Sequence, residues 1–143
     1  MNKLNDKNLI IYKDLDINEN YEFNKIQLKK VNGNIYIEWC YNLEEIDIWE
    51  VNWDLDVNET LLEKVKINKI DWDLYLSGEE NLEEVEIWEV NWDLLLSYTP
   101  VKKLQVEKIN WNLEIIWTSE NFKKTVKEQI KKWVLKIQWE IKF

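Results

Sequence analysis

Apolar and polar residues alternate along most of the chain, and the alternating pattern recurs about every 20 residues. Seven segments share apolar residues at their first, fifth and seventh positions, and the third position is tryptophan in five of them. The segments are IYKDLDI (11–17), VNGNIYI (31–37), VNWDLDV (51–57), IDWDLYL (70–76), VNWDLLL (90–96), INWNLEI (109–115) and IQWEIKF (137–143). Alternation with a period of two predicts strands, and the near-constant spacing predicts a repeat architecture.

A second apolar segment precedes five of these copies. These upstream segments are FNKIQL, LEEIDI, LLEKVKI, LEEVEI and VKKLQV. The alternation changes phase by one residue at the same two places in every repeat. Because such a change reverses the face to which side chains point, it predicts either aligned bulges or the corners of a coil. The residues left over, such as SGEEN and SYTP, predict a third turn.

The polar positions that point away from the core indicate how the repeats stack. Equivalent positions form three rows. Positive and negative charges alternate in Lys25–Glu45–Lys64–Glu84–Lys103 and in Lys30–Glu50–Lys69–Glu89–Lys108. The third row, Gln27–Asp47–Lys66–Glu86–Gln105, places acidic residues on both sides of a lysine. In parallel register, neighbours in a row lie about 4.8 Å apart, and opposite charges at that separation stabilise adjacent strands. The rows therefore favour a parallel β-solenoid of ~20-residue coils. The alternative is an antiparallel β-meander or barrel with a helix.

The C-terminal third departs from this period. The segment TSENFKKTVKEQIKKW predicts an amphipathic helix over about 119–133, with Thr118 or Ser119 as its N-cap. Its apolar face consists of Phe122, Val126, Ile130 and Trp133. Because a solenoid needs its open end covered, we expect this helix to be a cap. The chain is thus predicted to be one mainly β domain over 1–143, with coils over about 1–117 and a final strand over about 134–143.

The first half of each repeat, for example LEEVEIWEV or LLEKVKINKI, has an apolar spacing that resembles a leucine-rich repeat. The resemblance covers roughly residues 23–115. The family usually has Asn at the positions of Val51, Ile70, Val90 and Ile109, and Leu at those of Trp53, Trp72, Trp92 and Trp111. Its convex side is often helical, whereas this chain alternates there like a strand. The resemblance implies a non-enzymatic binding solenoid, and a plain β-helix fits the pattern equally well.

The formal net charge is −9, and it is concentrated in the centre of the chain. Residues 41–96 contain 17 acidic residues and three lysines, whereas residues 97–143 contain ten lysines and five acidic residues. An acidic centre argues against nucleic acid as a partner and favours a basic protein surface. No apolar run is long enough to cross a membrane. The single cysteine, Cys40, forms no intramolecular disulfide and fits a reducing, cytoplasmic location.

The residue types needed for catalysis are missing. The chain has no histidine, the usual general base and the commonest metal ligand. It also lacks a Gly-rich phosphate loop and a CxxC motif. Its carboxylates are copied from repeat to repeat, as structural residues are. We therefore expect a protein that is not an enzyme and that has no cofactor and no metal site.

The octet IWEVNWDL occurs twice, at 48–55 and 87–94, and contains two kinds of tryptophan. The second tryptophan recurs as Trp53, Trp72, Trp92, Trp111 and Trp139, and its alternation predicts a stacked column inside the core. The first, Trp49 or Trp88, falls at an expected corner where other repeats have Lys29, Asn68 and Glu107. Exposed tryptophans among acids suit a protein-binding surface. The alternatives are packing under a loop and a remnant of duplication.

Two further rows flank the tryptophan column, namely Asn32–Asn52–Asp71–Asn91–Asn110 and Asn34–Asp54–Asp73–Asp93–Asn112. We expect the first to form an amide ladder. In the second, carboxylates about 5 Å apart repel one another unless they are paired or neutralised, and Asp56 adds to the same patch. The patch is interpreted as a surface for a basic partner, with a calcium site or a solvated face as alternatives.

Together these observations predict a non-enzymatic acidic module that occupies a basic surface of a partner protein, as immunity-type and anti-defence-type inhibitors do. The expected partner-binding residues are Trp49, Trp88, Asp54, Asp56, Asp73 and Asp93. One alternative is a structural or designed repeat protein that self-associates through the edge of its solenoid. A second is a β-barrel that binds a small ligand or carbohydrate, which requires antiparallel strands.

Overall fold

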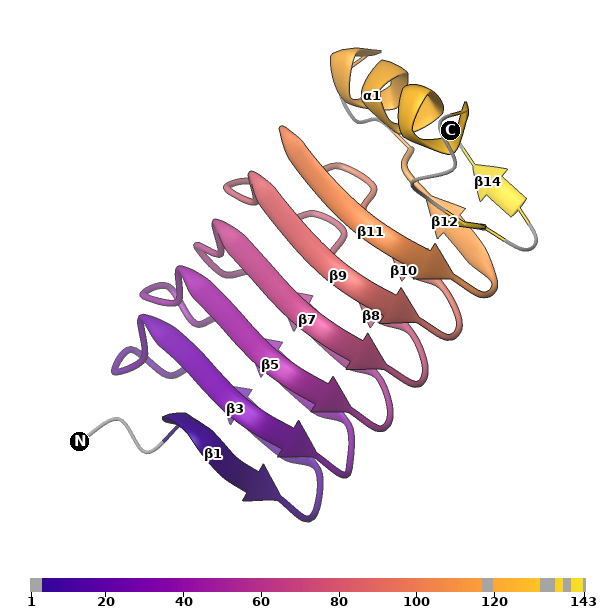
Figure 1. Ribbon diagram of the computed structural model, residues 1–143. Helices are drawn as coiled ribbons and strands as arrows, with labels where there is room; N and C mark the ends of the chain where they lie inside the picture. The colour runs from indigo at the N-terminus through magenta and orange to yellow at the C-terminus, as the bar shows by residue number, and fades with distance from the viewer. Residues whose placement is uncertain (1–3, 117–119, 132–135, 138–139, 143) are drawn as a thin grey trace.

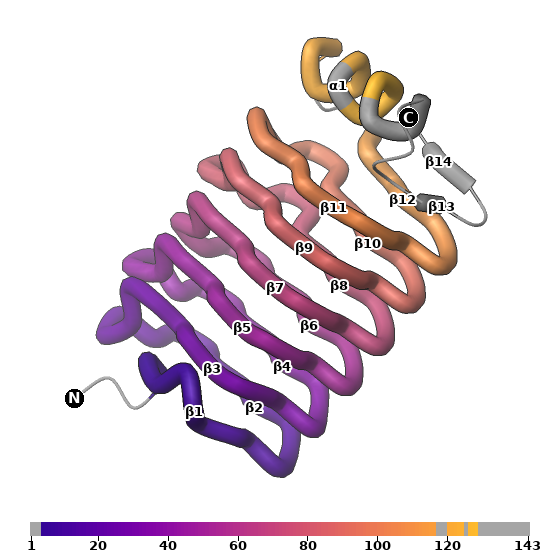
Figure 2. The backbone as a smooth tube through the Cα atoms, in the orientation of Figure 1, coloured from indigo at the N-terminus to yellow at the C-terminus, as the bar shows by residue number. Residues whose placement is uncertain are grey.

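The computed structural model describes residues 4–116, 120–131, 136–137 and 140–142. Over these residues the chain winds into a parallel β-solenoid, in which each coil adds one strand to each of two sheets (Figure 1). Figure 2 shows the backbone following the same path from coil to coil. The predicted fold class is therefore confirmed: the protein is mainly β and its coils are stacked in parallel.

The two sheets face each other across the core, and the strand order in each follows the order of the coils. Sheet A consists of β1 (Asn5–Ile11), β3 (Lys25–Val31), β5 (Glu45–Val51), β7 (Lys64–Ile70), β9 (Glu84–Val90), β11 (Lys103–Ile109) and β13 (Lys136–Ile137). Sheet B consists of β2 (Leu15–Asn18), β4 (Ile35–Glu38), β6 (Leu55–Asn58), β8 (Leu74–Tyr75), β10 (Leu94–Leu95), β12 (Asn112–Glu114) and β14 (Glu140–Lys142).

The register of sheet A matches the rows of charge predicted from the sequence. Glu45 lies opposite Lys25 on one side and Lys64 on the other, and Lys64 in turn lies opposite Glu84. The Nζ of Lys25 is 3.1 Å from a carboxylate oxygen of Glu45, and that of Lys30 is 2.8 Å from Glu50. This parallel register excludes the antiparallel meander or barrel.

Buried aliphatic residues fill the space between the sheets in rows that run from coil to coil. The rows in the central coils are Ile26–Ile46–Val65–Val85–Leu104, Leu28–Ile48–Ile67–Ile87–Val106, Val31–Val51–Ile70–Val90–Ile109, Ile35–Leu55–Leu74–Leu94–Leu113 and Ile37–Val57–Leu76–Leu96–Ile115. Each row stacks side chains of nearly the same size, which suits the constant spacing of parallel strands.

The first change of phase is a bulge inside the strands of sheet A. In β5, Ile48 and Val51 are buried, whereas both residues between them, Trp49 and Glu50, point outward. The equivalent strands show the same inward and outward order, so the bulges are aligned along the sheet. Trp49 and Trp88 were expected at a corner, and the structure corrects this: both lie within strands, on the outer face of sheet A.

The second change of phase is a corner, and it corrects the prediction of a tryptophan column in the core. Between buried Val51 and buried Leu55 the chain turns, and all three intervening residues point outward. A continuous strand would have pointed the middle residue, Trp53, inward. Trp53, Trp72, Trp92 and Trp111 are instead 37–47% exposed. They stack as predicted, but on the surface; Trp139 lies outside the described residues.

Five successive coils of the described part of the chain each contain one residue with a left-handed backbone at the third corner. These residues, at equivalent positions, are Glu19 (φ 51°), Trp39 (φ 52°), Glu59 (φ 53°), Gly78 (φ 82°) and Tyr98 (φ 62°). Residues other than glycine rarely adopt this backbone conformation, because their Cβ atom crowds the following carbonyl oxygen. Gly78 is therefore the residue best suited to this corner.

Replacing Gly78 with alanine is expected to lower the free energy of unfolding by about 1 kcal/mol. A Cβ at this position meets no atom within 4 Å, so the cost comes from the backbone conformation alone. Glu59→Gly, at the equivalent corner, is expected to raise the free energy of unfolding. Urea unfolding of the two variants and the wild type measures both changes, and a stabilising Gly78→Ala would contradict the interpretation.

The helix α1 (Glu120–Lys131) lies at the C-terminal end of the stack (Figure 1). Phe122 and Val126 are buried in the same core cluster as the coils, so these two residues lie on the face that was predicted to be apolar. The N-cap positions Thr118 and Ser119, the side chain of Ile130 and all of Trp133 lie outside the described residues. The final strand is divided into β13 and β14, which pair with β11 and β12.

Candidate functional site

A groove lies on the outer face of sheet A. It has a volume of about 590 Å³ and crosses strands β5, β7, β9 and β11. Trp49 and Trp88 form its walls, each 62% exposed, and Asn68 lies between them on β7. Alternation turns Trp49 and Trp88 outward beside the buried Ile48 and Ile87, and the bulge turns the residues that follow, Glu50 and Glu89, outward as well.

The polar lining of this Trp49–Trp88 groove is acidic overall. It contains the carboxylates of Asp47, Glu86 and Glu107 and one ammonium group, that of Lys66. Asp47 accepts a hydrogen bond from Nε2 of Gln27 at 2.8 Å. Glu86 accepts one from Nζ of Lys103, also at 2.8 Å, and this contact lowers the pKa of Glu86. Glu86 is therefore ionised at neutral pH.

A smaller hollow of about 400 Å³ adjoins the groove on the side of β3. Asp47, Trp49 and Lys66 line both hollows, so the two hollows meet at these residues. The smaller hollow is lined by Lys7, Lys29 and Lys66, with Asp47 as its acid. The two hollows therefore have opposite charge character.

The corner tryptophans form a regular stack of a different kind. The ring centroids of Trp53 and Trp72 are 5.3 Å apart, those of Trp72 and Trp92 are 5.1 Å apart, and those of Trp92 and Trp111 are 5.2 Å apart. Each indole thus covers the face of its neighbour, and mainly ring edges remain open to solvent. In contrast, neither Trp49 nor Trp88 stacks on another ring among the described residues.

The aspartate row has a structural role that the sequence did not reveal. Oδ1 of Asp54 accepts the backbone N–H of Asp73 at 2.9 Å, and Oδ1 of Asp73 accepts that of Asp93 at the same distance. Oδ1 of Asp93 continues the series with the N–H of Asn112. Each carboxylate therefore joins one coil corner to the next, which offsets the repulsion expected between like charges.

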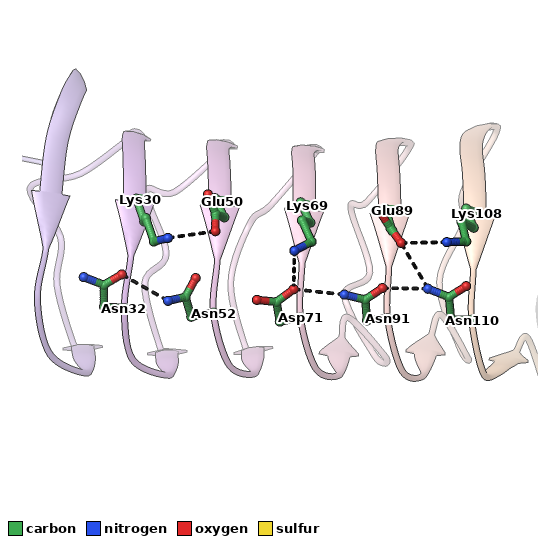
Figure 3. A network of polar contacts seen from close by, with 10 residues as sticks. All are labelled: Lys30, Asn32, Glu50, Asn52, Lys69, Asp71, Glu89, Asn91, Lys108 and Asn110. Carbon is green, nitrogen blue, oxygen red and sulfur yellow. Dashed lines mark hydrogen bonds and ion pairs between the residues drawn. The ribbon is translucent and has the colours of Figure 1, made fainter.

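The predicted amide ladder is present but interrupted, as Figure 3 shows. Nδ2 of Asn110 donates to Asn91 at 2.6 Å, and Nδ2 of Asn91 donates to Asp71 at 2.9 Å. At the other end, Nδ2 of Asn52 donates to Asn32 at 3.1 Å. The carboxylate of Asp71 has no N–H group to donate to Asn52, and the buried Oδ1 of Asn52 accepts no hydrogen bond among the described residues. Nζ of Lys69 lies 2.7 Å from Asp71, so this lysine neutralises the acid within the row.

Asp56 lies on sheet B, opposite Tyr36 and Tyr75. Partial burial raises the pKa of Asp56, a hydrogen bond from Nδ2 of Asn58 opposes the shift, and the nearby charge of Asp54 adds to it. The residues predicted to bind a partner therefore form two separate groups. Trp49 and Trp88 meet at the groove, whereas the aspartates follow the corner and sheet B.

A buried carboxylate, Glu79, lies in the third turn of its coil, where the sequence had suggested only a loop. It is 1% exposed, and its Oε2 accepts a hydrogen bond from Oγ1 of Thr60 at 2.6 Å. Its Oε1 has no hydrogen-bond partner among the described residues. Burial raises the pKa of Glu79, and the hydrogen bonds from Thr60 only partly oppose that shift. The equivalent residue in the next coil is Thr99, so a repeat alignment marks Glu79 as the exception in a row of small side chains.

Glu79→Gln is expected to raise the free energy of unfolding at pH 7 by about 1 kcal/mol. A raised native pKa means that the folded state holds the proton more tightly than the unfolded chain does. This contribution to stability is complete below the ordinary carboxyl pKa and is lost as pH rises through the raised value. The advantage of Glu79→Gln should therefore shrink as pH falls, and urea unfolding of both proteins across this pH range measures it. An advantage that grows towards acid pH would contradict this assignment.

Among the described residues, no group of three acidic or cysteine side chains is arranged to hold a metal ion. Within the same residues, no helix has the length and apolar character needed to cross a membrane. Comparisons of the chain with protein-family models, with curated proteins and with solved structures gave no match.

Proposed function

We propose that the protein is a non-catalytic binding module, which attaches to a basic surface of a partner protein through the Trp49–Trp88 groove. The carrying observation is that two tryptophans are 62% exposed and unstacked at a position where other coils have polar residues. The solenoid tolerates Lys29, Asn68 and Glu107 at that position, so the stacking of coils does not require tryptophan there. A binding role accounts for the two exceptions.

Tryptophan contributes strongly to protein interfaces, where it often forms the centre of the binding energy. The groove offers two indole rings on rigid strands, so little conformational freedom is lost when a partner docks. The net charge of −9 favours encounter with a basic partner. An inhibitor of the immunity or anti-defence type acts in this way, and the resemblance to leucine-rich repeats implies the same general role.

Affinity capture from the native source tests this proposal. Wild-type protein is expected to retain a basic protein at low salt and to release it as salt rises, because long-range charge attraction is screened. The double variant Trp49→Ala/Trp88→Ala should lose that protein while its unfolding midpoint stays within experimental error of the wild type. Retention of the same proteins by the double variant, or capture of none, would reject the proposed surface.

The aspartates of the corner remain predicted contributors to the same binding surface, and they need a separate variant. A triple variant removes three negative charges but keeps the Oδ1 atoms that accept backbone N–H groups of the next coil. Its substitutions are Asp54→Asn, Asp73→Asn and Asp93→Asn. If this variant captures the partner as well as the wild type does, binding is confined to the groove. If capture is lost, the basic surface of the partner extends round the corner.

A further inference from the structure

We infer that the gap between Trp49 and Trp88 is a clamp for the ammonium group of a lysine side chain. The lysine would belong to the basic partner of the proposed function, on which this inference rests. The groove is lined by two exposed indoles and three carboxylates, and aromatic rings combined with negative charge are the features that bind an organic cation.

The spacing of the strands sets the width of the clamp. Trp49 is on β5 and Trp88 on β9, with β7 between them. Two strand spacings amount to about 9–10 Å. A group held over β7 is therefore about 5 Å from each tryptophan-bearing strand, a separation compatible with the range of roughly 6 Å for cation–π attraction. A flat group stacks on a ring at about 3.5–4 Å. A guanidinium or an aromatic ring that stacks on one indole would therefore be too far from the other indole to touch it. A compact ammonium group is attracted to both.

The residue between the two rings leaves this space open and polar. Asn68 carries the short side chain at the central position, on the floor of the groove. Asp47 and Glu86 lie in the adjacent row, in the same coils as Trp49 and Trp88 respectively. A lysine ammonium above Asn68 therefore has an indole and a carboxylate in the coil on each side, and it shares the carboxylate of Glu86 with Lys103.

Lys66 sets a limit on the affinity of the clamp. It lies opposite both Asp47 and Glu86. The pKa of Glu86 is lowered chiefly by the hydrogen bond from Lys103, and the charge of Lys66 adds to that effect. It therefore competes with an incoming lysine for the two carboxylates. Lys66→Gln removes the competing charge and should strengthen lysine binding several-fold, whereas Lys29→Gln, which changes only the adjoining hollow, should not.

The test uses synthetic peptides that are identical except at one central residue, which is lysine, trimethyl-lysine, arginine or the neutral isostere norleucine. Binding is followed through the indole N–H resonances of the 15N-labelled protein. The lysine and trimethyl-lysine peptides should shift the signals of Trp49 and Trp88 and bind roughly tenfold more tightly than the norleucine peptide. Equal binding of norleucine or arginine, or shifts confined to other tryptophans, would overturn the clamp.

Protein variants separate cation binding from simple apolar contact. Trp49→Leu and Trp88→Leu keep an apolar side chain but remove the aromatic face, and each should weaken lysine-peptide binding roughly tenfold. Tyr12→Ala removes an exposed aromatic outside the groove and should leave binding unchanged. Full binding by the leucine variants would overturn the inference, because apolar contact would then suffice.

The clamp and the proposed function can fail separately. If a basic partner is captured from the native source and lost from the double variant, but lysine peptides do not bind, the clamp is wrong and the binding module stands. If lysine peptides bind between the two tryptophans but no basic protein is captured, the clamp stands and the proposed function is wrong.

Discussion

Trp72→Ala is expected to lower the free energy of unfolding by about 2–4 kcal/mol. Trp72 lies inside the corner stack, with ring centroids of Trp53 and Trp92 at 5.3 and 5.1 Å. Its removal breaks two stacked pairs and leaves a gap between coils that the neighbouring indoles cannot close. Urea unfolding followed by far-ultraviolet circular dichroism measures the loss without relying on tryptophan fluorescence.

Trp49→Ala is the matched control, since it removes the same side chain from an unstacked position. We expect a change within about 0.5 kcal/mol, as for other exposed residues without specific contacts. The two variants should behave in opposite ways: Trp72→Ala weakens the fold and keeps the groove, whereas Trp49→Ala keeps the fold and weakens lysine binding. Equal losses of stability would show that the two kinds of tryptophan do not differ in role.

Asp73→Ala is expected to cost about 2–3 kcal/mol in the free energy of unfolding. One carboxylate oxygen of Asp73 accepts the backbone N–H of Asp93 at 2.9 Å. The other accepts the hydroxyl of Tyr75 at 2.7 Å, a contact that raises the pKa of Tyr75. Alanine removes both acceptors and leaves the N–H of the next corner without its partner. Urea unfolding again provides the measurement.

Asp73→Asn separates the acceptor from the charge. Asparagine keeps one oxygen for the backbone N–H, as Asn34 does for the N–H of Asp54 at 3.1 Å, and it also reduces repulsion along the row. We expect a loss below about 1 kcal/mol, because only the bond from Tyr75 is given up. If alanine and asparagine cost the same, the carboxylate acts through its charge rather than as a link between corners.

The register of the solenoid was predictable because it depends on the chemistry of outward positions. Glu45 between Lys25 and Lys64 makes sense only if equivalent residues are neighbours, and the strand pairing shows that they are. The inward rows followed from the same argument, since a one-residue shift would have exposed them. Stacking of the corner tryptophans also followed, because parallel coils superpose identical residues.

The side to which the corner tryptophans point was not predictable from alternation. The run Val51–Asn52–Trp53–Asp54–Leu55 reads as a regular strand, and period two places Trp53 inside. The chain instead turns there, and the turn is stabilised by hydrogen bonds between coils that involve Asp54 and Asp73. A pattern within one repeat contains no information about side-chain bonds to the next repeat.

The groove and the buried Glu79 depend on local backbone geometry for the same reason. The sequence marked Trp49 and Trp88 as exceptional, but the change of phase beside them fits a corner as well as a bulge, and only the backbone path distinguishes the two. For Glu79, the segment SGEEN offers two adjacent glutamates, and polarity within this one repeat does not distinguish the buried one from its exposed neighbour. Both features arise from the path of the chain rather than from its polarity.

The alternating charge of sheet A restricts how such a molecule can grow. Deleting the coil that contains Lys64 would place Glu45 next to Glu84. Inserting a single coil would likewise bring residues of the same charge next to each other. Adding or removing a pair of coils keeps every lysine next to a glutamate. Length can therefore change only in steps of two strands, about 9–10 Å. Each added pair of coils that contains a copy of IWEVNWDL would add one exposed tryptophan to the groove, and with it one more gap between tryptophans of the same width. An extended chain advances about 3.3 Å per residue, so lysines at every third position of a partner would match a longer version of this surface.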